Sequence, residues 1–395
     1  MPAPTSPMLG RYLVRNRVAN TGLRVTDATL AALYGSRAVP IPESPERILI
    51  ATGGHLGDAV MSTAMLADLR AAFPSAQLDV IAPSWSAAVF DGHPLVGRVH
   101  VVDHWKTNRA ESGRAAKIAH YVTTAKRATR EIAAAKYDVA IDSYPFFPNM
   151  AGVLWRSGIP VRIGYVSGGL GPLYTHVLEW VDDREHITEK QRRLSRLLTR
   201  SRALAPRSRY ALAPSSSETT GRVDTMLDSR DRRQIVVLHA GAGSVQKDWP
   251  RARWIQLARE LPTSAAVRVV LTGAGARDAR IASEIAASVP ECVSLVDRLG
   301  WAEFVEVVRR ASLVVSGDTS AAHVAAATST PHIALFTGIN DSAEFRPLAE
   351  SSEVLTHAVP CAPCFRGEGC EAMTCIRAIE TDDVLRVGLT MLSKS

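Results

Sequence analysis

The order of short apolar runs and helical patterns is the feature that most constrains the fold of this chain. Residues 48–51 form a short apolar run that ends at Gly53 and Gly54, and a helical pattern of apolar residues begins at Asp58 and closes at Pro74. Residues 78–81 then form a second short apolar run. A strand, a crossover helix and another strand in this order predict a parallel sheet covered by helices.

The same alternation continues along most of the chain. Further strands are predicted at residues 99–102, 139–141, 161–164, 235–238, 267–271, 313–315 and 333–336. Helices are predicted at residues 115–136, 251–261, 277–288, 302–310 and 381–392. Basic residues follow one side of the first of these helices, and we expect them to form a solvated face. The predicted fold class is α/β, with two Rossmann-like domains built on parallel sheets.

A stretch rich in Ser, Pro and Thr at residues 206–231 separates the two series of strands. With 395 residues, the chain is long enough for two domains. The expected organisation is an N-terminal extension over residues 1–46 with a short helix at 28–34, an N-terminal domain over 47–210, an interdomain linker over 211–232, a C-terminal domain over 233–378 and a terminal helix over 379–395.

Composition bounds the partners that this chain can bind. Hydrophobic residues make up 46% and charged residues 22%, which is typical of a globular protein rather than a disordered one. The net charge of +7 favours anionic partners, such as a phosphate-bearing substrate or, in peripheral association, an anionic membrane. We expect no nucleic acid partner, because the sequence has no aromatic-and-basic RNA motif and no zinc-finger spacing. We expect a cytoplasmic protein, because no long apolar run and no signal peptide is present; the oligomeric state stays open.

The first candidate site is the turn that follows the strand at residues 48–51. Gly54, His55, Gly57 and Asp58 lie where a parallel strand passes to a helix, and ligands bind at this edge of open α/β sheets. Glycines allow a ligand to approach the backbone closely. The alternative is that Asp58 only caps the helix. The spacing does not match the dinucleotide pattern G-x-G-x-x-G.

The second candidate site is the loop at residues 239–250. Small residues, including Ser244, leave backbone amides accessible to phosphate, and Lys247 adds a compact positive charge. Trp249 and Pro250 follow just before a predicted helix. The loop is not a Walker loop, because no G-K-[ST] is present. The alternative is an ordinary β–α loop with a solvent-facing lysine.

The third candidate site follows the strand at residues 313–315. Asp318, Thr319 and Ser320 offer capping side chains, and an alanine-rich helix follows them. A helix N-terminus exposes unpaired N–H groups and positive potential, which suit a diphosphate. His323 lies one turn into the helix and can face the same ligand, or it can simply be packed.

The three segments, in this order, resemble the heptosyltransferase family of glycosyltransferases, known as family 9. The family pattern has an early glycine-aspartate turn, a lysine-x-tryptophan-proline loop and an Asp-[ST]-x-x-x-His-x-Ala-x-Ala helix start. In this chain these are Gly57-Asp58, Lys247-Asp248-Trp249-Pro250 and residues 318–327. The resemblance runs from about residue 47 to residue 387.

The resemblance implies the GT-B arrangement, in which two Rossmann-like domains face a cleft. It implies an inverting glycosyltransferase that moves heptose or a related sugar from a nucleoside diphosphate donor, expected to be ADP-linked, to a hydroxyl of a glycan, a glycolipid or a small natural product. The N-terminal domain would bind the acceptor and the C-terminal domain the donor. No metal would be required for catalysis, and the sequence contains no Asp-x-Asp motif.

The same resemblance assigns roles to individual residues. Asp58 would be the general base, beside an acceptor-side loop formed by Gly54, His55 and Gly57. The donor diphosphate would be bound by Ser244, Lys247, Asp318, Thr319, Ser320 and His323. Two other functions stay open: a nucleotide-sugar epimerase of similar architecture, and a non-catalytic protein that binds sugar nucleotides. The donor base, the sugar and the acceptor are not determined by the sequence.

Four cysteines crowd into a short segment near the C-terminus. Cys361, Cys364, Cys370 and Cys375 have the spacing C-x₂-C-x₅-C-x₄-C. Four thiolates can hold a structural zinc ion, and the opening C-x₂-C is a common half-site. Disulfides and unlinked thiols are the alternatives. We expect no catalytic role for these residues, because four protein ligands would leave zinc no open position.

Overall fold

The computed structural model describes residues 12–14, 16–34, 39–200, 209–228 and 230–394. Residues up to 183 together with residues 187–208 cluster into unit 1, and residues 184–186 together with residues from 209 onwards cluster into unit 2. Parts of the expected N-terminal extension (1–11, 15 and 35–38), and the stretch just before residue 209, lie outside the described residues.

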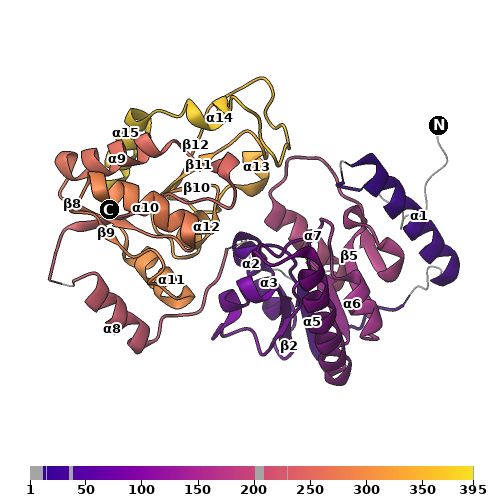
Figure 1. Cartoon of the computed structure of the whole chain (residues 1–395). Helices are drawn as coiled ribbons and strands as arrows, with labels where there is room; N and C mark the ends of the chain where they lie inside the picture. Colours follow the sequence, from indigo (N-terminus) through magenta and orange to yellow (C-terminus); the bar gives the residue numbers. More distant parts are fainter. Residues whose placement is uncertain (1–11, 15, 35–38, 201–208, 229, 395) are drawn as a thin grey trace. The chain divides into compact units, whose positions relative to one another are not determined.

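Unit 1 is built on a six-stranded sheet in the order β3-β2-β1-β4-β5-β6, in which every pair is parallel (Figure 1). The strands are β1 (Arg47–Ala51), β2 (Gln77–Ala82), β3 (Val99–Val101), β4 (Val139–Asp142), β5 (Val161–Tyr165) and β6 (His176–Leu178). All four residues of β4 are buried, because helices cover both faces of such a sheet. This explains why its strands read as continuous apolar runs.

The helices of unit 1 are α1 (Arg17–Tyr34), α2 (Leu56–Ser62), α3 (Ala64–Ala72), α4 (Ser84–Ala87), α5 (Arg114–Ala135), α6 (Ala151–Arg156) and α7 (Ile187–Thr199). The sequence analysis contained no prediction for α4, α6 and α7, and two other helices differ from their expected bounds. The helix of the N-terminal extension begins at residue 17 rather than 28. The helix expected from residue 58 begins at residue 56 and consists of α2 and α3, which share residue 63 as their boundary.

Unit 2 repeats this architecture with a sheet in the order β12-β11-β10-β7-β8-β9, again fully parallel. The strands are β7 (Gln234–His239), β8 (Val267–Leu271), β9 (Val293–Ser294), β10 (Leu313–Gly317), β11 (His332–Phe336) and β12 (Ser352–Thr356). Strands β6, β9 and β12 were not predicted, because these edge strands are only partly buried and form no apolar run.

The helices of unit 2 are α8 (Ser217–Met226), α9 (Arg251–Ser264), α10 (Ala276–Ser288), α11 (Trp301–Arg310), α12 (Ser320–Ala327), α13 (Ser342–Phe345), α14 (Thr374–Arg377) and α15 (Thr381–Leu392). The range expected as a linker contains α8, which packs against α11. Arg310 on α11 pairs with Asp224 on α8 at 2.6 Å. The terminal helix α15 packs against α9 and the sheet. Both segments therefore belong to unit 2.

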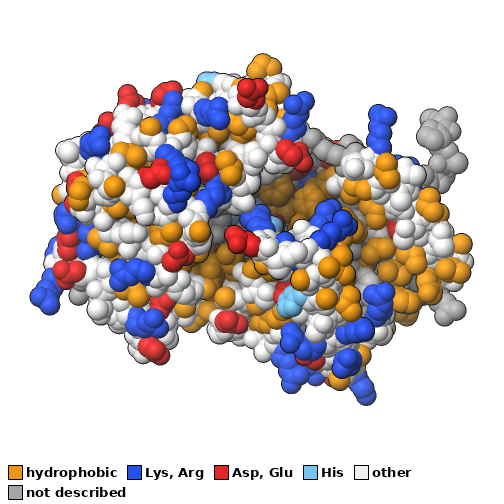
Figure 2. Space-filling view, viewed as in Figure 1, with side chains coloured by type: hydrophobic (Ala, Val, Ile, Leu, Met, Phe, Trp, Pro, Cys, Tyr) orange, Lys and Arg blue, Asp and Glu red, His pale blue; other side chains and the backbone are white. Residues whose placement is uncertain are grey.

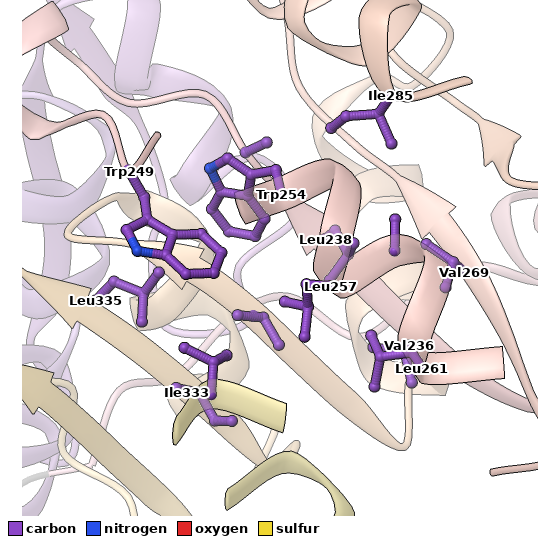
Figure 3. Close-up of a cluster of buried hydrophobic side chains, with 14 of the residues drawn as sticks. Val236, Leu238, Trp249, Trp254, Leu257, Leu261, Val269, Ile285, Ile333 and Leu335 are labelled. Atoms are coloured by element: carbon purple, nitrogen blue, oxygen red, sulfur yellow. The ribbon is translucent and has the colours of Figure 1, made fainter. Parts of the chain in front are cut away.

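The core of unit 2 is centred on two tryptophans that lie at right angles, with ring centroids 5.0 Å apart. Trp249 and Trp254 are almost fully buried. Figure 3 shows them among aliphatic side chains such as Leu257 and Leu335. Because Trp249 follows the loop of the second candidate site directly, its burial fixes where that loop leaves the core.

The two sheets share one strand order, and this order determines where each can bind a ligand. In each sheet the first strand in sequence lies between the second and the fourth, so β1 pairs with β2 and β4, and β7 pairs with β8 and β10. At this point the strand order reverses, so the chain connections that leave the two adjacent strands run in opposite directions along the sheet. Open α/β folds bind ligands at this point, outside the carboxyl ends of the strands.

No helix in the part of the chain that the structure describes is long and apolar enough to cross a membrane.

Candidate functional site

Asp58 lies in the first turn of α2, just beyond the carboxyl end of β1. His55 is the N-cap residue, and its backbone N–H donates to Oδ2 of Asp58 at 2.7 Å. Asp58 is thus the third helical residue and completes a capping box, rather than being the N-cap itself. This bond fixes the direction in which the carboxylate points.

Gly54 provides the space that the Asp58 carboxylate occupies. A Cβ atom at position 54 would lie 2.1 Å from Oδ2 of Asp58, so no other residue fits without moving the carboxylate. The carbonyl of Gly54 accepts a hydrogen bond from Nε1 of Trp85 at 3.1 Å. Gly57 lies within α2. The glycines and the aspartate of this turn therefore form one packed arrangement.

Two residues that the sequence analysis did not identify lie close enough to Asp58 to interact with it electrostatically. Tyr144 lies two residues beyond the end of β4, and its ring packs over Gly53. Burial raises the pKa of Tyr144, and the Asp58 carboxylate raises it further. Arg109 lies near both: burial lowers its pKa, while Asp58 and Tyr144 oppose that shift. The position of Tyr144, two residues after a central strand, is the signal that could have identified it.

Asp142 holds the segment that carries Tyr144. Its carboxylate is fully buried at the end of β4 and accepts hydrogen bonds from the Met150 N–H at 2.6 Å and the Tyr174 hydroxyl at 2.8 Å. Burial raises the pKa of Asp142 to about 6, against the effect of these hydrogen bonds. Since Asp142 pairs in register with Ala51 of β1, this network lies at the switch point of unit 1.

In unit 2 the structure brings the second and third candidate sites together. Nζ of Lys247 lies 2.5 Å from Oδ2 of Asp318, and both side chains are largely buried. Lys247 follows β7 and Asp318 follows β10, and these adjacent strands flank the switch point of the sheet. The backbone N–H of Lys247 donates to the carbonyl of Ser244 at 3.0 Å, which closes the loop.

The tryptophan and proline of the loop explain how Lys247 is held. Nε1 of Trp249 donates to the carbonyl of Ile379 at 2.9 Å, and the Trp249 ring is buried in the core. Pro250 is the N-cap residue of α9. The backbone at Lys247 has little freedom to move, because the buried Trp249 and the start of α9 follow it closely.

The N-terminus of α12 completes this arrangement. Thr319 is its N-cap, and its hydroxyl accepts from the Ala321 N–H at 3.3 Å. Ser320 is the first residue of the helix. The helix dipole and the unpaired N–H groups of this turn create positive potential beside Lys247. A diphosphate group is the class of ligand that such a site suits.

His323, one turn further into α12, is packed inside unit 2. It is 4% exposed, and its ring lies edge-on to Tyr210 with centroids 5.9 Å apart. Burial lowers the pKa of His323 to about 4, although the nearby Asp318 opposes the shift. The imidazole is therefore neutral at pH 7. Its Nδ1 has no hydrogen-bond partner in the structure.

Unit 2 also includes three residues that come from between β6 and α7. Arg184 pairs with Asp341, which is the N-cap residue of α13, through hydrogen bonds of 2.6 and 3.2 Å. Nε2 of His186 lies 2.8 Å from the carbonyl of Arg346. His186 is also near enough to His323 to influence its pKa, although burial has the larger effect. The sequence contains no signal for this association.

The cysteine segment is attached to unit 2 by its backbone. The N–H of Cys364 donates to the carbonyl of Gly338 at 2.8 Å, and Cys375 is buried in the core. Cys361 and Cys370 are exposed, and no cysteine of the described residues forms a disulfide. Within that same part of the chain, no three His, Cys, Asp or Glu side chains gather as a metal site would require. The structure thus does not bring the four thiols of Cys361, Cys364, Cys370 and Cys375 together.

Comparisons with known proteins show which proteins this chain is similar to. The family model described as glycosyltransferase family 9 (heptosyltransferase) matches residues 125–373, which is more than half of the chain. This range contains Lys247, Asp318 and His323 but not Asp58. The lipopolysaccharide heptosyltransferase 1 of Pseudomonas aeruginosa is 25% identical over 329 residues, which cover 81% of this chain and 86% of that protein.

Solved structures with the same fold span almost the whole chain. A family 9 glycosyltransferase from Veillonella parvula superposes with a TM-score of 0.74 at 18% identity, covering 91% of this chain and all of that one. The ADP-heptose lipopolysaccharide heptosyltransferase II of E. coli superposes with a TM-score of 0.70 at 20% identity, covering 88% of this chain and 99% of that one. These neighbours share the GT-B fold with this chain.

Proposed function

Because the chain belongs to glycosyltransferase family 9 and is a glycosyltransferase of the heptosyltransferase type, we propose that it transfers heptose or a related sugar from a nucleoside diphosphate donor. We further propose that the donor is ADP-linked, as the name of the E. coli relative says of that protein. The acceptor would be a hydroxyl of a glycan, a glycolipid or a small natural product, and the anomeric configuration would be inverted.

The observation that carries this proposal is the Lys247–Asp318 ion pair beside the N-terminus of α12. It lies at the switch point of unit 2, where a diphosphate can contact an ammonium group and helix amides at once. Asp318 orients the ammonium group of Lys247 through one hydrogen bond. The ammonium has further N–H groups that can donate to a donor phosphate.

The transfer itself requires one base and one stabilised leaving group. Asp58 accepts the proton of the acceptor hydroxyl while that oxygen attacks the anomeric carbon from the face opposite the diphosphate. The bond between the anomeric carbon and the phosphate oxygen breaks, and the leaving group keeps the electron pair. Lys247 and the amides of α12 stabilise the resulting charge. They supply positive potential where other transferases use a divalent cation.

The role of Asp58 is supported by its position rather than by the family match. It lies at the switch point of unit 1, and the capping box and Gly54 fix the direction of its carboxylate. Arg109 and Tyr144 lie near it.

Calorimetry with ADP and ADP-heptose, together with an assay of acceptor-dependent ADP release, tests the proposal. Lys247→Ala should weaken ADP binding about 10- to 100-fold, the usual loss for a charged hydrogen bond. The matched control is Arg280→Gln on α10, whose side chain is 74% exposed, and it should change nothing.

Three results would contradict the proposal. Unchanged ADP affinity in Lys247→Ala would remove the lysine from the donor site. Interconversion of the donor sugar without any acceptor would identify an epimerase. Tight donor binding without turnover, across glycan, glycolipid and small-molecule acceptors, would indicate a non-catalytic protein.

A further inference from the structure

A cavity of about 230 Å³ in unit 2 has no role in the proposed transfer reaction. It lies where the start of α9 approaches α10 and the short helix α14, and its apolar wall includes Val245, Trp249, Trp254 and Ile281. Neither Lys247 nor Asp318 lines it. Drug-sized ligands usually occupy cavities of about 300–1,000 Å³, so this smaller volume suits a molecule built on a single ring.

Two side chains of the wall carry a buried polar atom that has no hydrogen-bond partner among the described residues. Nε1 of Trp254 is such an atom, on a residue that is only 1% exposed. Oδ1 of Asp248 is the other, although Oδ2 of the same carboxylate pairs with Arg277. An unpaired buried donor and an unpaired buried acceptor are both costly, so a ligand that satisfies them gains binding energy. A hydroxyl group can do so, because it donates one hydrogen bond and accepts others.

The charged residues that line the cavity favour an anion. Arg251 and Arg377 are exposed and outnumber the single carboxylate of Asp248. Arg251 pairs with Glu284 at 2.7 Å, and Figure 2 shows Lys and Arg side chains beside Asp and Glu side chains over the region of α9 and α10. The Arg377 guanidinium donates to two backbone carbonyls, at 3.1 and 3.2 Å, and no carboxylate of the described residues balances its charge. A guanidinium in this state can bind a carboxylate through charged hydrogen bonds.

We propose that this cavity is a second ligand site, which takes a small aromatic carboxylate with a hydroxyl group on its ring. The ring contacts the apolar wall, where the flat side chains of Trp249 and Trp254 suit an aromatic partner. The hydroxyl group donates to Oδ1 of Asp248 and accepts from Nε1 of Trp254, and the carboxylate pairs with Arg377. This inference goes beyond the proposed reaction and does not rest on the identity of the donor.

The cavity and the proposed donor site share one loop. Val245 and Asp248 line the cavity, and Lys247, which lies between them in the chain, pairs with Asp318. A ligand that bonds to Asp248 restricts the motion of the loop, so less of the loop remains to be ordered when ADP binds. The two ligands should therefore bind together. Each should raise the affinity of the other by the same factor, about five-fold.

Calorimetry of the full chain with 4-hydroxybenzoate tests the proposal. This probe should bind at one site, and saturating ADP should not displace it. Benzoate lacks the hydroxyl group and 4-hydroxybenzamide lacks the charge, so each should bind about 10-fold more weakly or worse.

Substitutions place the probe in the cavity. Arg377→Gln should weaken 4-hydroxybenzoate binding about 10-fold, the loss expected for a charged hydrogen bond, and Trp254→Phe should weaken it about five-fold. Arg377 is exposed, so its variant tests the site even where Trp254→Phe disturbs the core. The matched control is Arg259→Gln, at an exposed position of α9 that does not line the cavity, and it should bind the probe as the unchanged protein does.

A donor-site variant separates this proposal from the proposed function. Lys247→Ala should lose ADP affinity and keep its affinity for 4-hydroxybenzoate. No saturable binding, equal affinity for all three ring compounds, or displacement of the probe by ADP would overturn the second site. ADP affinity that is the same with and without saturating 4-hydroxybenzoate would overturn the coupling through the loop.

Discussion

At the scale of single residues, one carboxylate combines a structural and a proposed chemical role. Asp58 accepts the N–H of His55 and so closes the first turn of α2. The same carboxylate is the proposed base. These roles can be separated, because an amide oxygen can accept the same backbone hydrogen bond but an amide cannot accept a proton at neutral pH.

Asp58→Asn should lower kcat by about 10²- to 10⁴-fold, the usual contribution of general-base catalysis. The asparagine keeps an oxygen for the His55 N–H, so the unfolding midpoint and ADP affinity should stay close to those of the unchanged protein. Steady-state kinetics and thermal unfolding of the same preparation measure both effects.

Two further variants make this test sharper. Asp58→Ala removes both roles and should also cost about 1 kcal/mol of stability through the lost cap. Gly54→Ala keeps Asp58 but adds a Cβ atom that would lie 2.1 Å from Oδ2 of Asp58, so the carboxylate has to move. We expect kcat to fall while ADP binding is kept. Near-normal turnover in Asp58→Asn would reduce Asp58 to a structural cap.

At the scale of elements, the central strands and most of the long helices were predictable because their apolar periods are strong, whereas the 13-residue helix α7 was not predicted. Strands β1, β2, β7, β8, β10 and β11 were all predicted within two residues of their observed bounds. Edge strands such as β12 were missed, since partial burial leaves no apolar run. Helix α8 was missed because its short polar sequence resembles a linker, and ion pairs with α11 hold it in place.

The candidate sites, like the elements, could be predicted only in part. The sequence placed Lys247 and Asp318 in separate loops, but the strand order that makes β7 and β10 neighbours is a property of the tertiary fold. The ion pair between them could not be predicted from spacing alone. Arg109 and Tyr144 were missed for the same reason, since they come from different loops that meet only in the folded unit.

The cysteine segment gives a prediction at this scale. Its backbone hydrogen bonds and the buried Cys375 hold the segment without any cross-link, and the four thiols do not gather. We therefore expect purified protein to contain less than about one-tenth equivalent of zinc or iron, well short of a structural zinc site. All five thiols should titrate under denaturant, and Cys361 and Cys370 should react first in the folded protein because they are exposed.

Elemental analysis and thiol titration decide between the alternatives for this segment. One equivalent of metal, with the four clustered thiols protected until a chelator is added, would establish the zinc site that their spacing suggests. Absence of metal together with missing thiols would indicate disulfides. Cys292 is the internal reference, since burial raises the pKa of its thiol to about 11 and should make it slow to react.

At the scale of the whole molecule, buried histidines should set the limit of stability in acid. Burial lowers the pKa of His104, His323 and His332 to about 4. Between pH 6.5 and pH 4, the unfolded chain therefore binds protons at these positions that the folded chain does not. The free energy of unfolding should fall as the pH falls through this window, by up to about 1.4 kcal/mol per pH unit for each histidine.

The buried carboxyl group of Asp142 has the opposite effect on how stability changes with pH. Burial raises its pKa to about 6, so the folded chain binds a proton that the unfolded chain does not bind until the pH approaches 4. From pH 7.5 to pH 5 this contributes about 1 kcal/mol of added stability. Three histidines outweigh one aspartate, so the protein should lose stability over this range.

His332→Leu isolates one of these contributions. The side chain is fully buried, its Nδ1 donates to the carbonyl of Thr330 at 3.1 Å, and its Nε2 has no hydrogen-bond partner in the structure. Leucine therefore removes a titrating group together with one hydrogen bond, and the loss of that bond affects stability at both pH values. Urea unfolding of unit 2 at pH 7.5 and pH 5 should show that the loss of stability between the two pH values is about 2 kcal/mol smaller in the variant. His357→Gln, at an exposed position, is the control and should leave the difference as it is. An equal loss in His332→Leu and in the unchanged protein would mean that His332 takes up its proton in the folded state as readily as in the unfolded one.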